Sequence, residues 1–533
     1  MSTASKIPDL MSRQFDLFSG VPTEEPMTEL KTALQSGRRF VMGDPSKIFV
    51  GTVPLEDYLR SSGERAAFTV ARLLDEQDWQ GFEQRYAATG RAPYAPRGMM
   101  GLILYGLMQG VHSLRALERL ARLDLGCMWV CGGITPDHAN IGRFILLHET
   151  SLTSDFFESL TRSVLRASGS KGRRLAGDGT VIEAACSHYK LLKEDALKAH
   201  VDAARDVLAR IPDDAQAQQT HQQAQRCQEI FETRQANRRR VGKSTESIRI
   251  SAIEPQAMVQ RLKRGRGFAA SYKPSVLVND DRIIVAVAVD PSSETAVMES
   301  MLDQSARVLG EHAQEVLLDA GYFDDKVITA TLDRTISLLC PSGQWPAKDK
   351  GTGLFHKSRF QYDQHTDTYR CPADQILRCQ TKVAPSVRTR EHRVYGTSSC
   401  AGCQLRVRCT QVVKGRKIKR YPEDEMRDAL RQIMEHPKAQ RVFRQRKAMV
   451  EPVFAHLRCQ QKLERFRRRG LAAVRREFAL HALAYNLSRA VRRLNALLIV
   501  LFNLLGHIYP VQNVLHRVTA CSAWKGRMLG VAF

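Results

Sequence analysis

One aspartate, Asp178, lies between two glycines in the otherwise apolar stretch RRLAGDGTVIEAACSHYK, residues 173–190. The apolar and β-branched residues around it predict a buried strand over residues 173–183. Burying an unpaired charge costs several kcal/mol, so buried carboxylates are usually paired or bound to a metal ion. The sequence therefore predicts a polar partner or a cation for Asp178.

A second group of ligand-type residues is a cluster of cysteines, since five of the 12 lie between residues 371 and 409. Cys400 and Cys403 form a CxxC, a spacing that suits two ligands of one tetrahedral Zn²⁺. Cys371 and Cys409 would complete a four-sulfur site, and Cys379 is a spare or an alternative ligand. Such a zinc would be structural, because four thiolates leave no open position. The alternative is a set of reduced, buried thiols. The other cysteines have no such spacing and are expected to be plain core or surface residues: Cys127, Cys131, Cys186, Cys227, Cys340, Cys459 and Cys521.

The charge balance indicates the class of partner. The 533 residues include 80 Lys plus Arg against 56 Asp plus Glu, a net charge of +24, and 43% are hydrophobic. This composition predicts folded domains that bind a polyanion, most simply nucleic acid. The N-terminal residues lack the layout of a signal peptide. The apolar run over residues 494–506 is interrupted by Asn503 and is too short to span a bilayer, so we expect a core or interface helix and a cytoplasmic protein.

The order of predicted helices and strands along the chain indicates the fold that would position these residues. Apolar residues at three- and four-residue spacing predict helices over residues 66–149, with Thr135 as one N-cap and Pro136 at the first helical position. Residues 191–237 predict one or two long helices with a break at Ile211–Pro212. The segments after them predict a hairpin over residues 275–290, a helix over 292–310 and a strand over 314–319. A helix over 324–333 and a strand over 335–342 follow.

This order is typical of a ribonuclease-H-like core. The predicted fold is therefore an α/β core, a mixed sheet flanked by helices, with an all-α N-terminal domain and a cysteine-rich insertion. The predicted parts are a lead-in (1–65), a helical domain (66–165), the first part of the core (170–345) with a helical insertion (191–250), the cysteine-rich segment (346–422), the last part of the core with basic helices (423–497) and a tail (498–533).

In that topology the strands that carry Asp178 and Asp319 lie side by side. Two facing carboxylates repel each other unless a cation lies between them. Glu451, the only acidic residue between Glu435 and Glu464, lies on a predicted helix whose apolar side would hold it against the sheet. The three carboxylates predict two Mg²⁺ (or Mn²⁺) ions, which at about 3.5–4 Å from each other can activate a water or a 3′-hydroxyl and stabilise the leaving oxygen of a phosphodiester.

Each carboxylate also has an ordinary interpretation. Asp178 alone could be a turn residue, Asp319 alone a helix N-cap, and Glu451 alone a surface charge in a basic stretch. The three together, in the right topological order, favour the metal site.

The same segments resemble bacterial insertion-sequence transposases of the DDE class, in the group with a cysteine-rich insertion in the catalytic domain. The resemblance covers about residues 40–495. Residues 92–148 look like the family's N-terminal helical domain. GDGTVIEAACS (177–187), LLDAGYF (317–323) and VEPVFAHLR with RGLAAVRREFALHALAYNLSRAV (450–458 and 469–491) look like its three catalytic blocks. The resemblance implies that Asp178, Asp319 and Glu451 are the catalytic triad.

Two positions depart from the family's usual pattern. Tyr272–Lys273 stands where a tyrosine–asparagine pair is frequent, and Arg458 stands where a lysine usually follows the catalytic glutamate by seven residues. Arginine can hold a phosphate as well, with a different geometry. These departures concern the level of activity and leave the chemistry intact.

DNA contacts are expected from the basic segment over residues 438–493, which holds 16 Lys or Arg against three Glu. The alternative for such a charge run is a solvated helix face. Contacts to phosphates would position a duplex without reading its bases. The residues predicted to contact DNA are Arg446, Arg458, Lys462, Arg467, Arg468 and Arg469 in this segment, and Asn140 and Arg143 in the N-terminal helices. The alternative for those helices is a packing or dimerisation unit.

The predicted function is metal-dependent DNA cleavage and strand transfer at insertion-sequence ends, in the bacterial cytoplasm at the nucleoid. The partners would be double-stranded DNA, both terminal inverted repeats and target, and other copies of the chain in a homo-oligomer. The alternatives are an inactive or domesticated DNA-binding remnant and a plain ribonuclease-H-like nuclease. The presence of all three carboxylates argues against the remnant.

Overall fold

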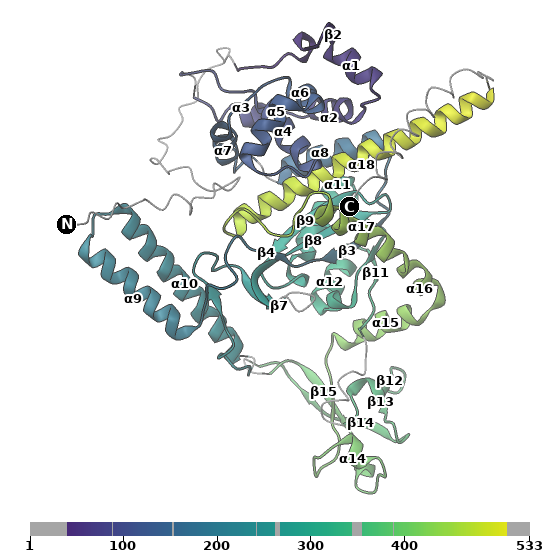
Figure 1. Cartoon of the computed structure of the whole chain (residues 1–533). Coiled ribbons are helices and arrows are strands. Elements are labelled where there is room, and N and C mark those ends of the chain that lie inside the picture. Colours follow the sequence, from purple (N-terminus) through teal and green to yellow (C-terminus); the bar gives the residue numbers. More distant parts are fainter. Residues whose placement is uncertain are drawn as a thin grey trace, which may run out of the picture.

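The computed structural model describes residues 40–508 except 88, 152–153, 241, 262–266, 344–353 and 387–388. A central α/β unit carries a helical domain on one side, and a helical hairpin and a small second sheet extend from it (Figure 1). Most of the predicted lead-in, much of the predicted tail and Cys521 lie outside the described residues.

The N-terminal helical domain packs around α4 (Pro96–Met108), which is apolar on all sides and almost entirely buried. A helix of this kind belongs at the centre of a domain. Gly101 allows the close packing, because a Cβ there would lie 3.0 Å from the carbonyl oxygen of Val130. A short hairpin, β1 (Phe49–Val50) and β2 (Val53–Pro54), precedes the helices. The other helices are α1 (Leu55–Ser61), α2 (Ala66–Asp75), α3 (Gln80–Glu83), α5 (Leu114–Leu123), α6 (Leu125–Cys131), α7 (His138–Leu147) and α8 (Ser154–Ser168).

The start of α7 corrects one sequence expectation. Its N-cap is Asp137, whose side chain accepts a hydrogen bond from the backbone N–H of Asn140 at 2.7 Å. The predicted cap, Thr135, lies two residues earlier, outside the helix. Threonine and aspartate both cap helices, so the sequence TPD offered two candidates, and Asp137 is the one beside the first helical turn.

The central sheet has the strand order β11-β10-β3-β8, with β9 also paired to β8. β3 is parallel to β10, β10 is parallel to β11, and β8 is antiparallel to both β3 and β9. This mixed sheet is the ribonuclease-H-like arrangement. Short strands β4 and β7 pair with the first half of β8. The strands are β3 (Arg174–Gly179), β4 (Ile182–Glu183), β7 (Met258–Arg261), β8 (Phe268–Asn279), β9 (Ile284–Asp290), β10 (Glu315–Leu317) and β11 (Ser337–Leu339).

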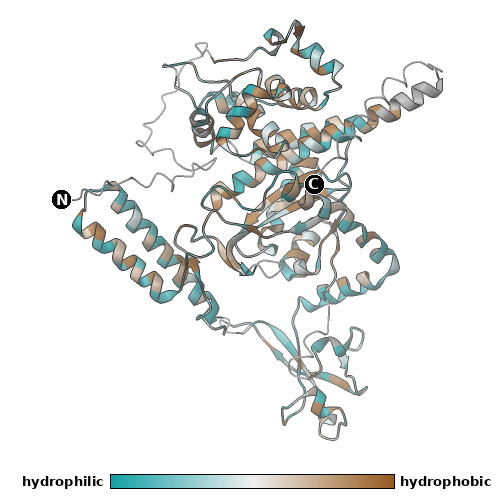
Figure 2. Cartoon of the chain, in the orientation of Figure 1, coloured by the Kyte–Doolittle hydropathy of each residue, from teal (hydrophilic) through white to brown (hydrophobic). Residues whose placement is uncertain are grey.

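Helices cover this sheet. The helices α11 (Met298–Leu309) and α18 (Leu471–Ile508) pack against β9, α12 (Asp325–Asp333) against β11, and α17 (Gln445–Cys459) against β3. α18 also contacts α2, α4 and α8, so it joins the helical domain to the sheet (Figure 1). Figure 2 shows hydrophobic residues along the central strands, where the core lies.

Two insertions leave the central unit. The first is the hairpin of α9 (Glu194–Arg210) and α10 (Ala215–Arg240), which meet at the predicted Ile211–Pro212 break and are flanked by β5 (Leu191–Leu192) and β6 (Ile250–Ser251). The second is a five-stranded antiparallel sheet with a small core of its own. Its elements are β12 (Gln361–Asp363), β13 (Thr368–Arg370), β14 (Ile376–Val383), β15 (His392–Gly396), α14 (Arg406–Cys409) and β16 (Ile418–Arg420). The chain returns to the core through α15 (Asp424–Glu435) and α16 (Pro437–Phe443).

The far end of α18 includes residues 494–506, for which the sequence predicts a core or interface helix. Leu497 and Val500 are 50% and 54% exposed, so these side chains do not lie in a core of this chain, and the interface alternative stays a prediction. Among the described residues, no helix is both long and apolar enough to cross a membrane.

Candidate active site

The register of β3 and β10 brings two aspartates together. Ala176 on β3 lies opposite Leu317 on β10, and the strands are parallel. Asp178 and Asp319 each follow two residues later, so both lie at the carboxyl ends of neighbouring strands. Asp319 also caps the short 3₁₀ helix Ala320–Tyr322, where its side chain accepts a hydrogen bond from the N–H of Gly321 at 2.9 Å.

Arg446, near the start of α17, lies between these carboxylates. Its Nη2 is 3.0 Å from Asp178 Oδ1 and 3.6 Å from Asp319 Oδ2. Its Nε donates a hydrogen bond to the carbonyl oxygen of Gly177 at 3.1 Å. Only 7% of the residue is exposed, so the guanidinium is fixed against the end of β3. The protein therefore stabilises positive charge at the point where the two aspartates meet.

The groups around Asp178 shift its pKa in opposite directions. Burial raises the pKa of Asp178, and the nearby Asp319 raises it further. Arg446 and the backbone N–H of Gly179, which donates to Asp178 Oδ1 at 2.9 Å, lower that pKa. The net shift of the pKa is upward, because desolvation is the largest contribution. A second cation beside Asp178 would favour its ionised form.

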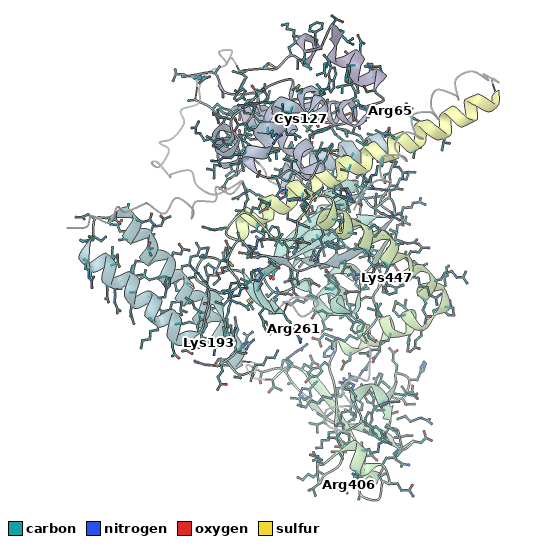
Figure 3. All side chains as sticks on the ribbon, in the orientation of Figure 1. Arg65, Cys127, Lys193, Arg261, Arg406 and Lys447 are labelled. Carbon is teal, nitrogen blue, oxygen red and sulfur yellow. The ribbon has the colours of Figure 1, made fainter. Side chains whose placement is uncertain are left out.

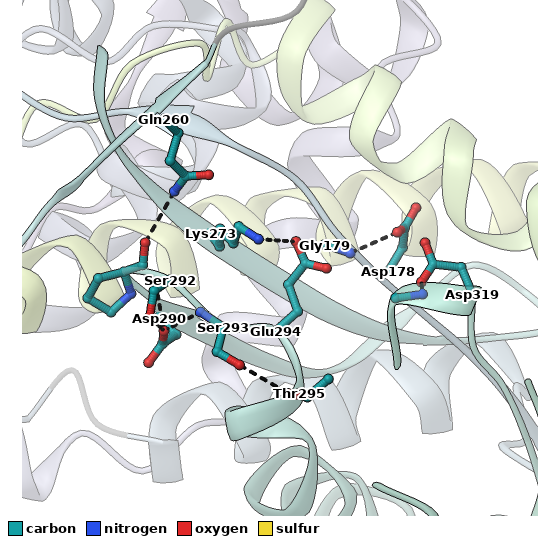
Figure 4. Close-up of polar contacts among 12 residues, drawn as sticks. Asp178, Gly179, Gln260, Lys273, Asp290, Ser292, Ser293, Glu294, Thr295 and Asp319 are labelled. Atoms are coloured by element: carbon teal, nitrogen blue, oxygen red, sulfur yellow. Dashed lines mark hydrogen bonds and ion pairs between the residues drawn. The ribbon is translucent and has the colours of Figure 1, made fainter. Parts of the chain in front are cut away.

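A third acidic side chain, Glu294, lies beside the aspartates, and sequence reasoning did not single it out (Figure 4). A Cβ on Gly179 would lie 2.7 Å from Glu294 Cδ, so this glycine allows the glutamate to approach β3. Burial raises the pKa of Glu294, Lys273 lowers it, and Asp319 and Asp178 raise it. The Lys273 Nζ is 3.6 Å from Glu294 Oε1. The only sequence signal was an acid after the second hairpin strand, which is too common to select it.

Glu451 is on the same helix as Arg446 but is exposed. Among the described residues it makes no recorded hydrogen bond or ion pair with Asp178 or Asp319, and no group of three His, Cys, Asp or Glu side chains is arranged to hold a metal ion. Seven residues along a helix return to within about 20° of the same direction, so Glu451 shares an edge of α17 with Arg458. Arg458 donates to the hydroxyl of Thr180 and, at 3.0 Å, to the carbonyl oxygen of Val181. That edge of α17 therefore lies along the end of β3.

The basic segment divides into buried and exposed arginines. Arg446 and Arg468, two of the residues predicted to contact DNA, are only 7% and 1% exposed, so neither side chain is presented to solvent. A side chain enclosed by protein cannot reach a phosphate, and burial of an individual arginine is not visible in a charge count. Lys462 and Arg469 are exposed, and Arg467 is half-buried.

The N-terminal residues predicted to contact DNA lie together on α7. The guanidinium of Arg143, which is exposed, donates to the side-chain oxygen of Asn140 at 3.1 Å. Asn140 itself is half-buried. Arg143 is therefore the better placed of the two for an external partner.

The cysteines of the small sheet form one group. One cavity is lined by four of them, Cys371, Cys400, Cys403 and Cys409, together with aromatic residues such as Phe355 and Phe360. Burial raises the pKa of the Cys409 thiol, Arg416 lowers it, and the other three cysteines of this cavity raise it. Cys379 is not among them; its thiol donates to the carbonyl oxygen of Thr381. The four thiols are near neighbours, although they are not drawn into tetrahedral contact.

Two family models match the chain. Residues 57–146 match a transposase domain (DUF772), and residues 370–491 match the family described as "Transposase DDE domain". The two matches, in this domain arrangement, indicate a DDE transposase of an insertion sequence. No curated protein and no solved structure is similar enough to give a match.

The transposase is thus an enzyme that cleaves DNA and transfers strands, and DNA is its partner. Its family generally uses divalent metal ions. The first match covers α1 to α7, and the second covers most of the small sheet, α17 and half of α18. Neither match reaches β3 or β10, so the roles of Asp178 and Asp319 depend on the geometry described above.

Proposed function

We propose that Asp178, Asp319 and Glu451 are the carboxylates with which the transposase cleaves DNA at the ends of an insertion sequence and joins the freed 3′-hydroxyl to target DNA. The observation that carries this proposal is the position of Asp178 and Asp319 at the carboxyl ends of adjacent parallel strands, with Arg446 between them. Two carboxylates that meet at such an edge repel each other and favour a cation there.

The donor atoms suit Mg²⁺ or Mn²⁺, because hard divalent cations prefer carboxylate oxygens and retain open positions for water and phosphate. Asp178 and Asp319 would hold the ions from the two strands. When bound, two such ions would activate the attacking water or 3′-hydroxyl and stabilise the leaving oxygen. The chain's own contribution is to fix both carboxylates by strand register and to hold the end of β3 through Arg446 and Arg458.

Two glutamates compete for the third position. Glu451 is supported by its edge of α17, which runs along the end of β3, and by its place within the segment that matches the DDE domain. Glu294 is supported by its electrostatic coupling to both aspartates. Because Lys273 already partly neutralises Glu294, we assign the third catalytic role to Glu451 and a supporting role to Glu294.

For the small sheet we propose a structural zinc held by Cys371, Cys400, Cys403 and Cys409. The support is that these four cysteines line one cavity and that the thiol of Cys409 is coupled to the other three. Zinc bound by four thiolates has no open coordination position, so its role would be to stabilise this sheet.

For DNA binding we propose Arg458, Lys462, Arg467 and Arg469 as phosphate contacts beside the site, and the N-terminal helices with Asn140 and Arg143 as the part that recognises terminal repeats. Arg446 and Arg468 are removed from that set because they are buried. We also propose that two or more copies act together at the nucleoid, since an element has two ends.

The test compares four isosteric variants: Asp178→Asn, Asp319→Asn, Glu451→Gln and Glu294→Gln. End cleavage and end binding are measured separately on a duplex that carries one terminal repeat. The first three should lower the cleavage rate by at least about a thousandfold, because each removes a charge that holds the cation, a loss of roughly 4 kcal/mol. Glu294→Gln should lower it by about tenfold or less.

The matched control is Glu435→Gln, which removes the same charge from an exposed position on α15. It should cleave at the rate of the unmodified protein. Cleavage that survives in either aspartate variant would remove that residue from the active site. A larger loss in Glu294→Gln than in Glu451→Gln would exchange the roles of the two glutamates.

A further inference from the structure

A broad groove lies where the α9–α10 hairpin meets the central sheet. Its lining comes from the end of α10, the loop before β6, the start of β7 and β8 and the residues after β9. We call it the hairpin groove, and its charged lining residues are Lys193, Arg234, Arg238, Lys243, Glu246 and Arg249. Its volume is about 1250 Å³. Figure 3 labels Lys193 at the foot of the hairpin, where α9 begins.

The basic residues of the hairpin groove have two different roles. Arg234 donates to the carbonyl oxygens of Pro255, Gln256 and Ala257, and so holds the groove wall together. In the same way Arg238 donates to the carbonyl oxygen of Ser244 at 3.0 Å. These two arginines are structural, because they donate hydrogen bonds to carbonyl oxygens of the protein.

The other three cations of the lining differ from these two arginines. Lys193, Lys243 and Arg249 are exposed, and none of them forms an ion pair within the part of the chain that the structure describes. Glu246 is the one acidic residue in the groove lining among these described residues. Clustered cations with so little compensation create a positive potential that attracts a polyanion.

The groove leads toward the catalytic carboxylates. Pro291 and Ser292 form part of its wall, and Glu294, which lies beside Asp178, follows two residues later. The side chain of Gln260 on β7 donates to the carbonyl oxygen of Pro291 at 3.2 Å, which fixes this connection (Figure 4). Phe268, at the start of β8, also lines the groove, and the same strand carries Lys273 to Glu294.

The exposed basic loop before α18 borders the groove on another side. The N–H of Gly470 donates to Glu254 Oε1 at 2.9 Å, and the N–H of Leu471 donates to Gln256 Oε1 at 2.8 Å. Gln256 and Leu471 both line the groove. The exposed Arg469 therefore continues the positive surface of the groove toward α18.

We propose that the hairpin groove binds the phosphate backbone of duplex DNA next to the phosphodiester at the active site, with Lys193, Lys243 and Arg249 as the contacts. The proposal rests on the proposed function and adds to it the path of the DNA. The groove, at about 1250 Å³, is larger than ordinary small-ligand sites, which are about 300–1,000 Å³. Its unpaired cations match a polyanion, and its wall at Ser292, two residues before Glu294, places that polyanion on the side of the active site.

The test is a salt titration of DNA binding by the full chain. The groove variant carries Lys193→Ala, Lys243→Ala and Arg249→Ala together. Each lost phosphate contact lowers the slope of log affinity against log salt by roughly 0.9, so the slope should fall by about 2–3. The loss should be equal on terminal-repeat and random duplexes, because backbone contacts carry no sequence information.

Two matched variants control for charge and for folding. Lys198→Ala, Arg210→Ala and Arg226→Ala remove three exposed cations from the same hairpin outside the groove, and together they should leave the slope nearly unchanged. Lys193→Arg, Lys243→Arg and Arg249→Lys keep the charges and should retain the slope. An equal fall in slope for the groove variant and the Lys198 set would overturn the proposal.

Whether the groove binds donor or target DNA is tested by shortening the duplex on one side of the cleavage site at a time. If the groove holds donor DNA, the difference between the unmodified protein and the groove variant disappears when the side that reaches the groove is removed. If it holds target DNA, the difference persists and appears in strand transfer by pre-cleaved ends. Either result supports the groove, whereas unmodified protein that neither binds nor cleaves terminal repeats would instead contradict the proposed function.

Discussion

The carboxylates at the end of β3 and the cysteines of the small sheet are the two groups of side chains that we propose as metal ligands, and different structures support them. Asp178 and Asp319 are held by the register of a seven-stranded sheet and by Arg446. Three of the four cysteines lie on short turns or the single-turn helix α14, beside a sheet whose core has five fully buried side chains. The first group is positioned by the fold before any cation binds. The second lies beside a small core, so its proposed ligands are the ones expected to depend on a bound metal for their positions.

The largest expected effect is therefore on the small sheet. Removing zinc with a chelator, or making Cys400→Ser with Cys403→Ser, should unfold residues 354–420, because structural zinc sites supply about 10–16 kcal/mol of apparent binding energy to folding. Metal analysis should find about one zinc per chain, and limited proteolysis should cut the treated protein within this region while the central core resists.

Cys379→Ser is the matched control, since Cys379 does not line the cavity of the other four cysteines. It should leave zinc content and protease resistance unchanged. Zinc-free protein with an intact small sheet would show that both sites are held by the fold alone, and the contrast between them would disappear.

A smaller effect is expected at the carboxylates when Arg446→Gln removes the cation between them. The free energy of unfolding should fall by about 2–3 kcal/mol, at the lower end of the loss for a broken buried ion pair, because Asp319 is 42% exposed at its side chain. Urea denaturation at neutral pH measures this loss. Added Mg²⁺ should recover more stability in the variant than in the unmodified protein.

Lys447→Gln removes the same charge one residue later on α17, where the side chain is exposed. Its stability should change by less than about 0.5 kcal/mol. Equal losses in the two variants would mean that Arg446 contributes only surface charge, and that the aspartates do not depend on it.

The smallest effects concern the two glycines that flank Asp178. Gly177→Ala should cost about 1–3 kcal/mol of unfolding free energy, because its Cβ would clash with Leu318 and lie 2.9 Å from Leu277 Cδ2 inside the core. Gly179→Ala should cost less than about 1 kcal/mol, because its Cβ meets only the movable end of Glu294. Thermal or urea unfolding of both variants measures the two stability losses. A larger loss in Gly179→Ala would mean that the tighter packing is at Gly179 and not at Gly177.

The sequence predicted the parts of the site that depend on strand order. Asp178 and Asp319 were found because neighbouring parallel strands in this topology bring their carboxyl ends together. The role of Arg446 was not found, since an arginine in a basic stretch gives no sign that it will be buried 269 residues away from its partner Gly177. Glu294 was missed because its approach to β3 depends on the absence of a side chain at Gly179, a contact between residues that are far apart in the chain.

The long separation between β3 and α17 has a consequence for the timing of synthesis. Arg446 and Gly177 are 269 residues apart in the chain, with both insertions between them. A ribosome that adds about 5–20 residues per second would need roughly 13–54 s to make that interval. During this time the nascent chain carries Asp178 and later Asp319 without the helix that supplies Arg446 and Glu451. On the proposed assignment, Glu451 joins the two aspartates only after α17 has been made, so the active site is complete only when synthesis is nearly finished.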